Sequence, residues 1–395
     1  MVRAAATAVP AARDRGRKPD AMILHMSSHR ATAYPARAAG LALRRPARGD
    51  RVLVPGDLGY YMGRYAFYQG LRSLLAAGSP RRRVLLPALH CSVLVEACLA
   101  AGLTSEFYPV SLTGAPDLAA LRSQAGPDVL AVVVVHLYGW PADVAAVKAA
   151  VSHSGAAIVE DCAHALFSRA GGAYVGSSGD VSIFSLRKSL PVPDGGVLRL
   201  NRAGLSAVPP VLVRAALRRG AGTTARLLGG GAVIRVVRRL ARSRATAGRD
   251  GAPPGGELSG FAPALVRASM SPLTRQVAAR VVPSDIVQRR RAAYTGLHHL
   301  LEDHPRFRPL FEGLPEGVCP LSLVILHPRR DQVETALLDR GVEVWSFGRG
   351  HHSSFDPSRF PETRQLCDES LALPVHQEMD PNDLEHLADL VRESL

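Results

Sequence analysis

Residues 129–161 read VLAVVVVHLYGWPADVAAVKAAVSHSGAAIVED, and this stretch decides the fold. Val129–Val135 is an apolar run of strand length, 142–152 has the spacing of a helix, and 156–160 is a second apolar strand. A strand, a helix and a strand in this order are typical of an α/β domain built around a mostly parallel sheet. The stretch therefore predicts two buried parallel strands joined by a helix.

The same alternation continues on the N-terminal side of this unit. The pattern predicts helices and strands in turn, namely helix 63–77, strand 84–86, helix 93–101, strand 106–110 and helix 116–124. In sheets of this kind ligands bind at the carboxyl ends of the strands. His136 and Asp161 each follow a predicted strand directly, so both are candidates for a binding site.

The C-terminal third has a different pattern. We expect a helix within 284–303, strands at 323–326 and 342–344, and a closing helix over 383–395. These elements indicate a smaller α+β domain over 259–395. The large domain would cover 49–258, with a basic insertion at 205–250, and residues 1–48 would form a flexible basic arm.

Composition restricts the function further. The 395 residues include 48 Lys and Arg against 34 Asp and Glu, a net charge of +14, which favours anionic partners. Aromatic residues make up only 5% and are not interleaved with arginine, so we expect no nucleic-acid surface. The five cysteines lack metal-ligand spacing, and no apolar run is long enough to span a membrane. These features predict a reduced cytoplasmic protein without a metal ion.

The basic segment 205–250 has two readings. Residues 233–242, VIRVVRRLAR, have the amphipathic spacing of a helix that could lie on a membrane surface. Charge runs more often form a solvated helix face, and that interpretation is favoured here.

Lys188 is one of only three lysines, with Lys18 and Lys148. A lysine forms a Schiff base with an aldehyde cofactor, and arginine cannot replace it. On position alone, an ordinary surface lysine is an equally good interpretation of Lys188. Asp161 could in turn pair with a pyridinium nitrogen, and His164 lies three residues further along.

A phosphate site is also indicated. Gly63 and Arg64 open the first predicted helix, where backbone N–H groups can hold a phosphate. Ser182 and Ser185 lie on the strand before Lys188 and could add hydroxyl groups. A glycine-opened helix, a strand-end aspartate, a strand with serines and a lysine, in this order, fit an enzyme that uses pyridoxal 5'-phosphate (PLP).

With these features together, the chain resembles the DegT/DnrJ/EryC1/StrS family of PLP-dependent sugar aminotransferases. The resemblance rests on the order and spacing of five segments and a Leu-Pro-x-His ending: VLLPALHC (84–91), HLYGWPAD (136–143), VEDCAHAL (159–166), VGSSGDVSIFSLRK (175–188), PDGG (193–196) and LALPVH (371–376). It covers residues 50–200 well and 286–395 loosely. It implies a large PLP-binding domain of the aspartate aminotransferase-like type, fold type I, with a mostly parallel sheet and a smaller C-terminal domain.

The resemblance also implies roles for single residues. Lys188 would be the Schiff-base lysine and proton carrier, Asp161 would hold the pyridine nitrogen, and His164 would lie near the ring hydroxyl. The phosphate would be held by Ser185 with the backbone at Gly63 and Arg64, and Ser182 was a further candidate. The ring-stacking position falls near His90 or Cys91, where the family usually has an aromatic residue.

Three features depart from the family pattern. The interval from Ser185 to Lys188 is shorter by about two residues, Asp194 replaces a glutamate, and the segment that reaches the partner subunit's site is not recognisable at 259–275.

The function implied is transfer of an amino group from Glu or Gln to a nucleotide-linked keto-sugar by a homodimer. Two alternatives stay open: a PLP-dependent sugar dehydratase, which Lys188 disfavours, and a non-catalytic regulatory or membrane-associated protein.

Overall fold

The computed structural model describes residues 51, 53–213, 261–347 and 351–395. The strands are β1 Leu58–Tyr60, β2 Arg83–Pro87, β3 Thr104–Tyr108, β4 Val129–Val135, β5 Ala157–Asp161, β6 Arg169–Ala170, β7 Ala173–Tyr174, β8 Val181–Ser185, β9 Gly196–Leu200, β10 Ser322–Leu326 and β11 Ser370–Pro374. The α-helices are α2 Gly63–Ala76, α3 Ser92–Ala100, α4 Leu118–Gln124, α5 Val144–Val151, α6 Leu186–Ser189, α9 Pro272–Ala278, α10 Pro283–Leu301, α11 Arg330–Asp339, α12 Pro361–Glu369 and α13 Pro381–Ser394.

Seven strands form the main sheet, in the order β1-β9-β8-β5-β4-β2-β3. The run from β8 to β3 is parallel, while β9 is antiparallel to β8 and β1 is antiparallel to β9. β4 and β5 lie side by side near the middle of the sheet, as residues 129–161 predicted. The α/β fold with a mostly parallel sheet is confirmed.

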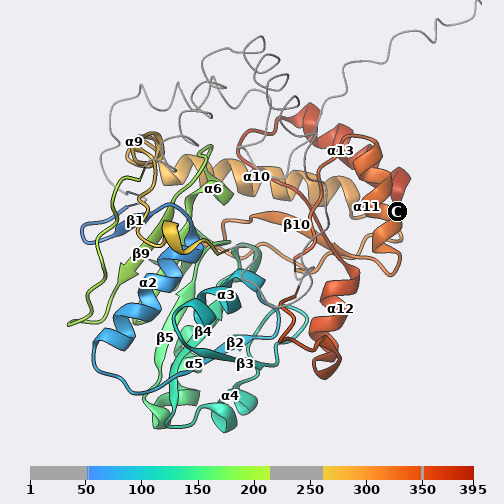
Figure 1. Ribbon diagram of the computed structural model, residues 1–395. Helices are drawn as coiled ribbons and strands as arrows, with labels where there is room; N and C mark the ends of the chain where they lie inside the picture. The colour runs from blue at the N-terminus through green and yellow to red at the C-terminus, as the bar shows by residue number, and fades with distance from the viewer. Residues whose placement is uncertain (1–50, 52, 214–260, 348–350) are drawn as a thin grey trace, which may run out of the picture.

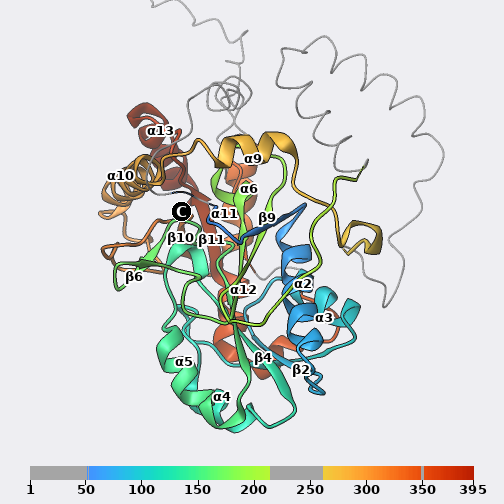
Figure 2. The ribbon, with the colours of Figure 1, turned by 90° about the vertical axis from the view of Figure 1, so that its left-hand side faces the viewer.

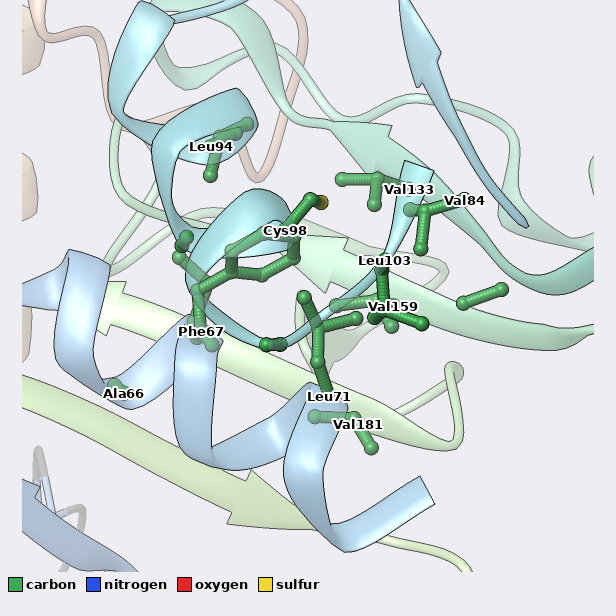
Figure 3. Close-up of a cluster of buried hydrophobic side chains, with 14 of the residues drawn as sticks. Ala66, Phe67, Leu71, Val84, Leu94, Cys98, Leu103, Val133, Val159 and Val181 are labelled. Carbon is green, nitrogen blue, oxygen red and sulfur yellow. The ribbon is translucent and has the colours of Figure 1, made fainter. Parts of the chain in front are cut away.

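Helices cover both faces of this sheet (Figure 2), so its central strands must be apolar on both sides. On one face, α2 and α3 pack against the sheet through Phe67, Leu71 and Cys98, among other residues (Figure 3). On the other face, α4 and α5 contribute Leu121 and Val147. Because both layers bury apolar residues on the sheet, the strand ends are held in fixed positions for a site.

The C-terminal elements gather beyond one end of the sheet (Figure 1). β10 and β11 form a separate antiparallel pair, and α10, α11 and α13 pack on it around one apolar cluster. The helix expected within 284–303 and the strand at 323–326 are present as α10 and β10.

Some expectations differ from the structure or lie outside it. The strand expected at 342–344 is wrong, because this segment makes only isolated bridges, such as Trp345 with Ala372. The arm 1–48 and most of the insertion 205–250, from residue 214 onward, lie outside the described residues. The domain boundaries stay a prediction. Within the described ranges no helix is long and apolar enough to cross a membrane.

Candidate functional site

Lys188 lies on α6, a single turn directly after the carboxyl end of β8. Its Nζ is 5.7 Å from the centroid of the Trp345 ring. Burial holds the pKa of Lys188 below its ordinary value of 10.5, and Cys91 and Asp161 offset part of this effect. The amine is therefore easier to keep neutral than that of an exposed lysine.

Asp161 ends β5, the strand beside β8. Its Oδ1 accepts a hydrogen bond from the backbone N–H of Ala163 at 2.9 Å. Among the described residues no donor contacts Oδ2, so one carboxylate oxygen is free for a ligand. Burial raises the pKa of Asp161, and the charge of Lys188 acts in the opposite direction. A cationic N–H group placed at Oδ2 would favour the ionised carboxylate.

His164 is buried in an aromatic group next to these two side chains. Its ring centroid is 5.3 Å from that of Trp345, 4.9 Å from Phe347 and 5.7 Å from Tyr138. The backbone N–H of Tyr138 donates to Nδ1 of His164 at 3.4 Å, so the ring proton is on Nε2. Burial holds the pKa of His164 well below its ordinary value. His164 is therefore a neutral ring with one N–H donor on Nε2.

The N-terminus of α2 lies beside the same strand ends. A Cβ on Gly63 would be 3.8 Å from Cβ of Ser185, the last residue of β8. Met62, which precedes α2, makes no side-chain capping bond. Ser185 is a buried residue, and its hydroxyl makes no hydrogen bond with the other described residues. The hydroxyl of Ser185 therefore lies close to the first backbone N–H groups of α2, a helix of 14 residues. Donors grouped at the N-terminus of a helix can bind an anion.

Glycine is required where β9 passes this helix. A Cβ on Gly196 would lie 2.2 Å from the carbonyl carbon of Met62. A side chain at this position would collide with the backbone at the start of α2, so Gly196 allows α2 to begin close to β9.

The comparisons with known proteins agree with this geometry. Residues 64–220 match the model of the DegT/DnrJ/EryC1/StrS aminotransferase family. The chain is similar to this family over this segment.

Two curated relatives are similar over part of their length. L-glutamine:2-deoxy-scyllo-inosose aminotransferase of Streptoalloteichus tenebrarius is 32% identical over 200 residues, which cover 44% of this chain and 46% of the relative. UDP-N-acetyl-3-dehydro-alpha-D-glucosamine 3-aminotransferase of Acidithiobacillus ferrooxidans is 33% identical over 163 residues, 40% of this chain and 43% of the relative. The chain therefore spans less than half the length of the curated relatives that it matches.

Solved structures share the fold over nearly the whole chain. The aminotransferase PseC of Helicobacter pylori superposes with a TM-score of 0.67 at 16% identity, covering 94% of this chain and 99% of PseC. The aminotransferase TlmJ of Streptoalloteichus hindustanus gives 0.63 at 21% identity, covering 96% and 91%. The chain thus has the fold of these aminotransferases, and the expected fold class is confirmed.

Several segments that resemble DegT/DnrJ/EryC1/StrS motifs serve the structure rather than a ligand. Glu160 accepts hydrogen bonds from the backbone N–H groups of Gly176, Ser178 and Gly179 and pairs with Nε2 of His136 at 2.9 Å. Burial acts to raise the pKa of Glu160, but His136 and these amides hold it below its ordinary value. His136, predicted to face a ligand, is instead part of this buried pair.

Asp194, at the position of the family's glutamate, also has a structural role. Its Oδ1 accepts from the N–H and Oγ of Ser271 at 3.0 and 3.2 Å, and from Oγ1 of Thr274 at 2.6 Å. Burial raises the pKa of Asp194, and these hydrogen bonds act against that. Asp194 therefore anchors the turn after Lys188 to the start of α9.

Ser182 and His90 are not brought to the Lys188 site. Neighbouring residues of a strand point to opposite faces, so Ser182 and Ser185, three apart, cannot share one. The hydroxyl of Ser182 instead accepts from Nδ2 of Asn201 at 3.2 Å. The His90 ring stacks on Phe107, with centroids 4.7 Å apart, and its Nδ1 bonds to the carbonyl of Ala88 at 2.9 Å.

Sequence reasoning gave no role to Tyr138, Trp345 or Phe347, which surround His164. Trp345 is 157 positions from Lys188 in the chain, and no local pattern links the two. Cys91 was named only as an alternative to His90, yet Cys91 is the residue that lies close enough to affect the pKa of Lys188. The resemblance itself was the only signal for Cys91.

Proposed function

We propose that this protein is a PLP-dependent aminotransferase that transfers an amino group from Glu or Gln to a nucleotide-linked keto-sugar. The observation that carries the proposal is the grouping of Lys188, Asp161 and His164 beside the Ser185–α2 anion site. Each of these side chains offers an unused group of the right kind to one part of PLP. The match to the family model over residues 64–220 and the names of the relatives support the same activity.

The residues present fit PLP part by part. Asp161 has a free carboxylate oxygen for the pyridine N–H, and His164 has an N–H on Nε2 for the ring oxygen. Ser185 and the amides at the start of α2 suit the phosphate. PLP, when bound, supplies an aldehyde that takes up the amino group and a ring that withdraws electrons.

The protein's own part in the reaction is proton transfer and charge placement. Lys188 would hold the aldehyde and then carry a proton at Nζ between the substrate carbon and the cofactor. A base needs a free electron pair, so burial that favours the neutral amine suits this role. Asp161, as an anion, would keep the pyridine nitrogen protonated.

The names of several relatives and the net charge support the proposed substrate class. One relative is named for L-glutamine as donor and another for a UDP-linked dehydro-sugar, and a third is a GDP-perosamine synthase of Escherichia coli. The net charge of +14 favours a diphosphate-bearing substrate over a neutral one. Lysine at position 188 also favours transfer of an amino group over the dehydratase alternative.

We further propose that the working form is a homodimer, since the resemblance implies a site shared between two chains and C2 pairing is the commonest symmetry. Sedimentation equilibrium should give the mass of two 42.0 kDa chains. A single-chain mass at the concentration used for activity would contradict this.

The test of the function is a visible absorption spectrum with added PLP. A band should appear in the wild type and in Lys148→Ala, a control at an exposed lysine, and be absent in Lys188→Ala. Borohydride should then fix PLP to the peptide that contains Lys188.

The amino-group chemistry is tested next on the same sample. Glu or Gln should abolish the band, and a nucleotide-linked keto-sugar should restore it with release of an amino-sugar. A band that is unchanged in Lys188→Ala would overturn the proposal and leave the non-catalytic alternative. A deoxygenated product without an amino group would indicate the dehydratase.

A further inference from the structure

A buried arginine lies behind the site, on α10. Arg290 is 1% exposed, and its Nε donates to Oε1 of Gln377 at 2.9 Å. Its Nη1 donates to the carbonyls of Pro320, Leu321 and Val375 at 3.1 to 3.3 Å. All of these acceptors are uncharged. Nη2 of Arg290 is buried without a hydrogen-bond partner among the described residues, and the charge of Glu378 acts to stabilise the cation. Because a buried cation is costly, the side chain depends on the hydrogen bonds that it does make.

Gln377 connects Arg290 to the turn that carries Lys188. Its Nε2 donates to the backbone carbonyl of Ser189 at 3.0 Å, and Ser189 directly follows Lys188. Gln377 is itself buried, just after β11. A chain of two hydrogen bonds thus runs from Arg290 through Gln377 to the residue next to Lys188.

The turn at Lys188 needs such support. α6 has only four residues, and one turn of helix is not stable alone. Ser185 precedes α6 and makes no side-chain capping bond. The carbonyls at the end of a helix lack partners within it, and Gln377 supplies a donor to one of them.

We propose that Arg290 and Gln377 are positioning residues that fix the α6 turn and so hold the Lys188 amine inside the site. This support comes from the β10–β11 sheet, because Arg290 donates hydrogen bonds to carbonyls directly before β10 and directly after β11. The proposal rests on Lys188 being the reactive lysine of the proposed function. Its test needs no cofactor, so the two proposals fail separately.

The same helix offers a matched control. Arg291 donates to the carbonyls of Pro315 and Val318 at 2.7 Å, and to Leu314 at 3.2 Å. It therefore ties α10 to a loop through carbonyl groups, as Arg290 does, but it has no connection to Ser189.

The experiment is competitive labelling of lysines with acetic anhydride on the cofactor-free protein, across a pH series. Only three lysines are present, and exposed Lys148 serves as the internal reference. Peptide mass spectrometry gives the labelling of Lys188 at each pH. In Gln377→Met the released turn should bring Lys188 toward water, and its labelling midpoint should rise by about one pH unit toward the ordinary value. Arg291→Met should leave the midpoint unchanged.

Gln377→Asn, which keeps the amide on a shorter side chain, provides a second variant if Gln377→Met does not fold. Hydrogen exchange at Leu190, whose N–H bonds to the carbonyl of Leu186 at 2.8 Å, should speed up in the Gln377 variants alone. An unchanged Lys188 midpoint in a folded Gln377 variant would overturn the proposal. So would an equal shift in Arg291→Met, because that would mean only general loosening of α10.

Discussion

Lys188 is held where its charge is disfavoured, and this has a consequence for stability. Burial places the pKa of Lys188 in the folded protein below the value of 10.5 that it has when unfolded. At a pH below the pKa in the folded protein, Lys188 is protonated in both the folded and the unfolded protein. Burial of its charge then lowers the free energy of unfolding by the full amount. This loss of stability becomes smaller as the pH rises from the pKa in the folded protein to that in the unfolded protein. It is absent above pH 10.5, where the amine is neutral in both states.

Lys188→Met should therefore stabilise the cofactor-free protein. We expect a higher Tm at pH 7, and the gain should shrink as pH approaches 10.5. Thermal unfolding across this range measures both. Lys148→Met, at an exposed position of α5, should show no such trend. A gain that is constant with pH would mean that better packing by Met, and not charge, is the cause.

Asp161→Asn should separate binding of PLP from catalysis. The amide keeps the shape of the side chain but loses the negative charge that would hold the pyridine nitrogen protonated. We expect kcat to fall by about a hundredfold or more, the usual scale for losing one key electrostatic group. PLP binding, measured by the absorption band, should persist.

Asp143→Asn is the control for that variant. Asp143 caps α5 by accepting from the N–H of Ala146 at 2.9 Å. Replacing it should cost about 1 kcal/mol of stability or less and leave kcat unchanged. Equal losses of kcat in the two variants would contradict the role of Asp161.

At the scale of elements, β8 allows a comparison between two serines. Ser185 ends the strand beside α2, whereas Ser182 bonds to Asn201 on the other face. Ser185→Ala should weaken PLP binding by about tenfold, since a hydrogen bond to a charged group contributes about 1.5 kcal/mol or more. Ser182→Ala should leave it unchanged. Titration of apoprotein with PLP measures both, and equal affinities in the two variants would remove Ser185 from the phosphate site.

Elements with a strong local signal were predictable from the sequence. β4 is apolar on both faces, β5 begins with three apolar residues, and α2 begins at Gly63 as expected. The strand at 342–344 was wrong, because its apolar residues face the C-terminal cluster without forming a ladder. Local propensity does not show whether a partner strand is available.

The residues of the candidate site that directly follow strand ends could be predicted from the sequence. The residues that only tertiary packing brings to the site could not. Lys188, Asp161 and His164 follow strand ends that the parallel sheet places side by side. The two-residue period of a strand places Ser182 and Ser185 on opposite faces of β8, and the hydroxyl of Ser182 accepts from Asn201. Trp345 and Arg290 come from elements far away in the sequence, so only the folded chain brings them to the site.

At the scale of the whole molecule, the candidate site lies where the main sheet meets the C-terminal elements, and Trp345 is one of the side chains in this contact. Its backbone pairs with Ala372 of β11 through bonds of 2.7 and 3.2 Å. One side of its ring packs on His164 and Phe347, and the side chain is only partly buried near Lys188. A rigid aromatic surface in this position suits the apolar face of a sugar ring.

Trp345→Ala should therefore affect the sugar more than the amino donor. Aromatic contacts contribute about 0.5–1.5 kcal/mol, so KM for the keto-sugar should rise by up to about tenfold. The rate at which Glu or Gln abolishes the PLP band should change less, because a small amino acid offers less apolar surface to the Trp345 ring than a sugar does. Trp140→Phe is the control, since Trp140 stacks on Phe311 at 4.0 Å between centroids and is the only other tryptophan. If the donor and sugar steps slow equally in Trp345→Ala, the ring supports the site as a whole and does not recognise the sugar.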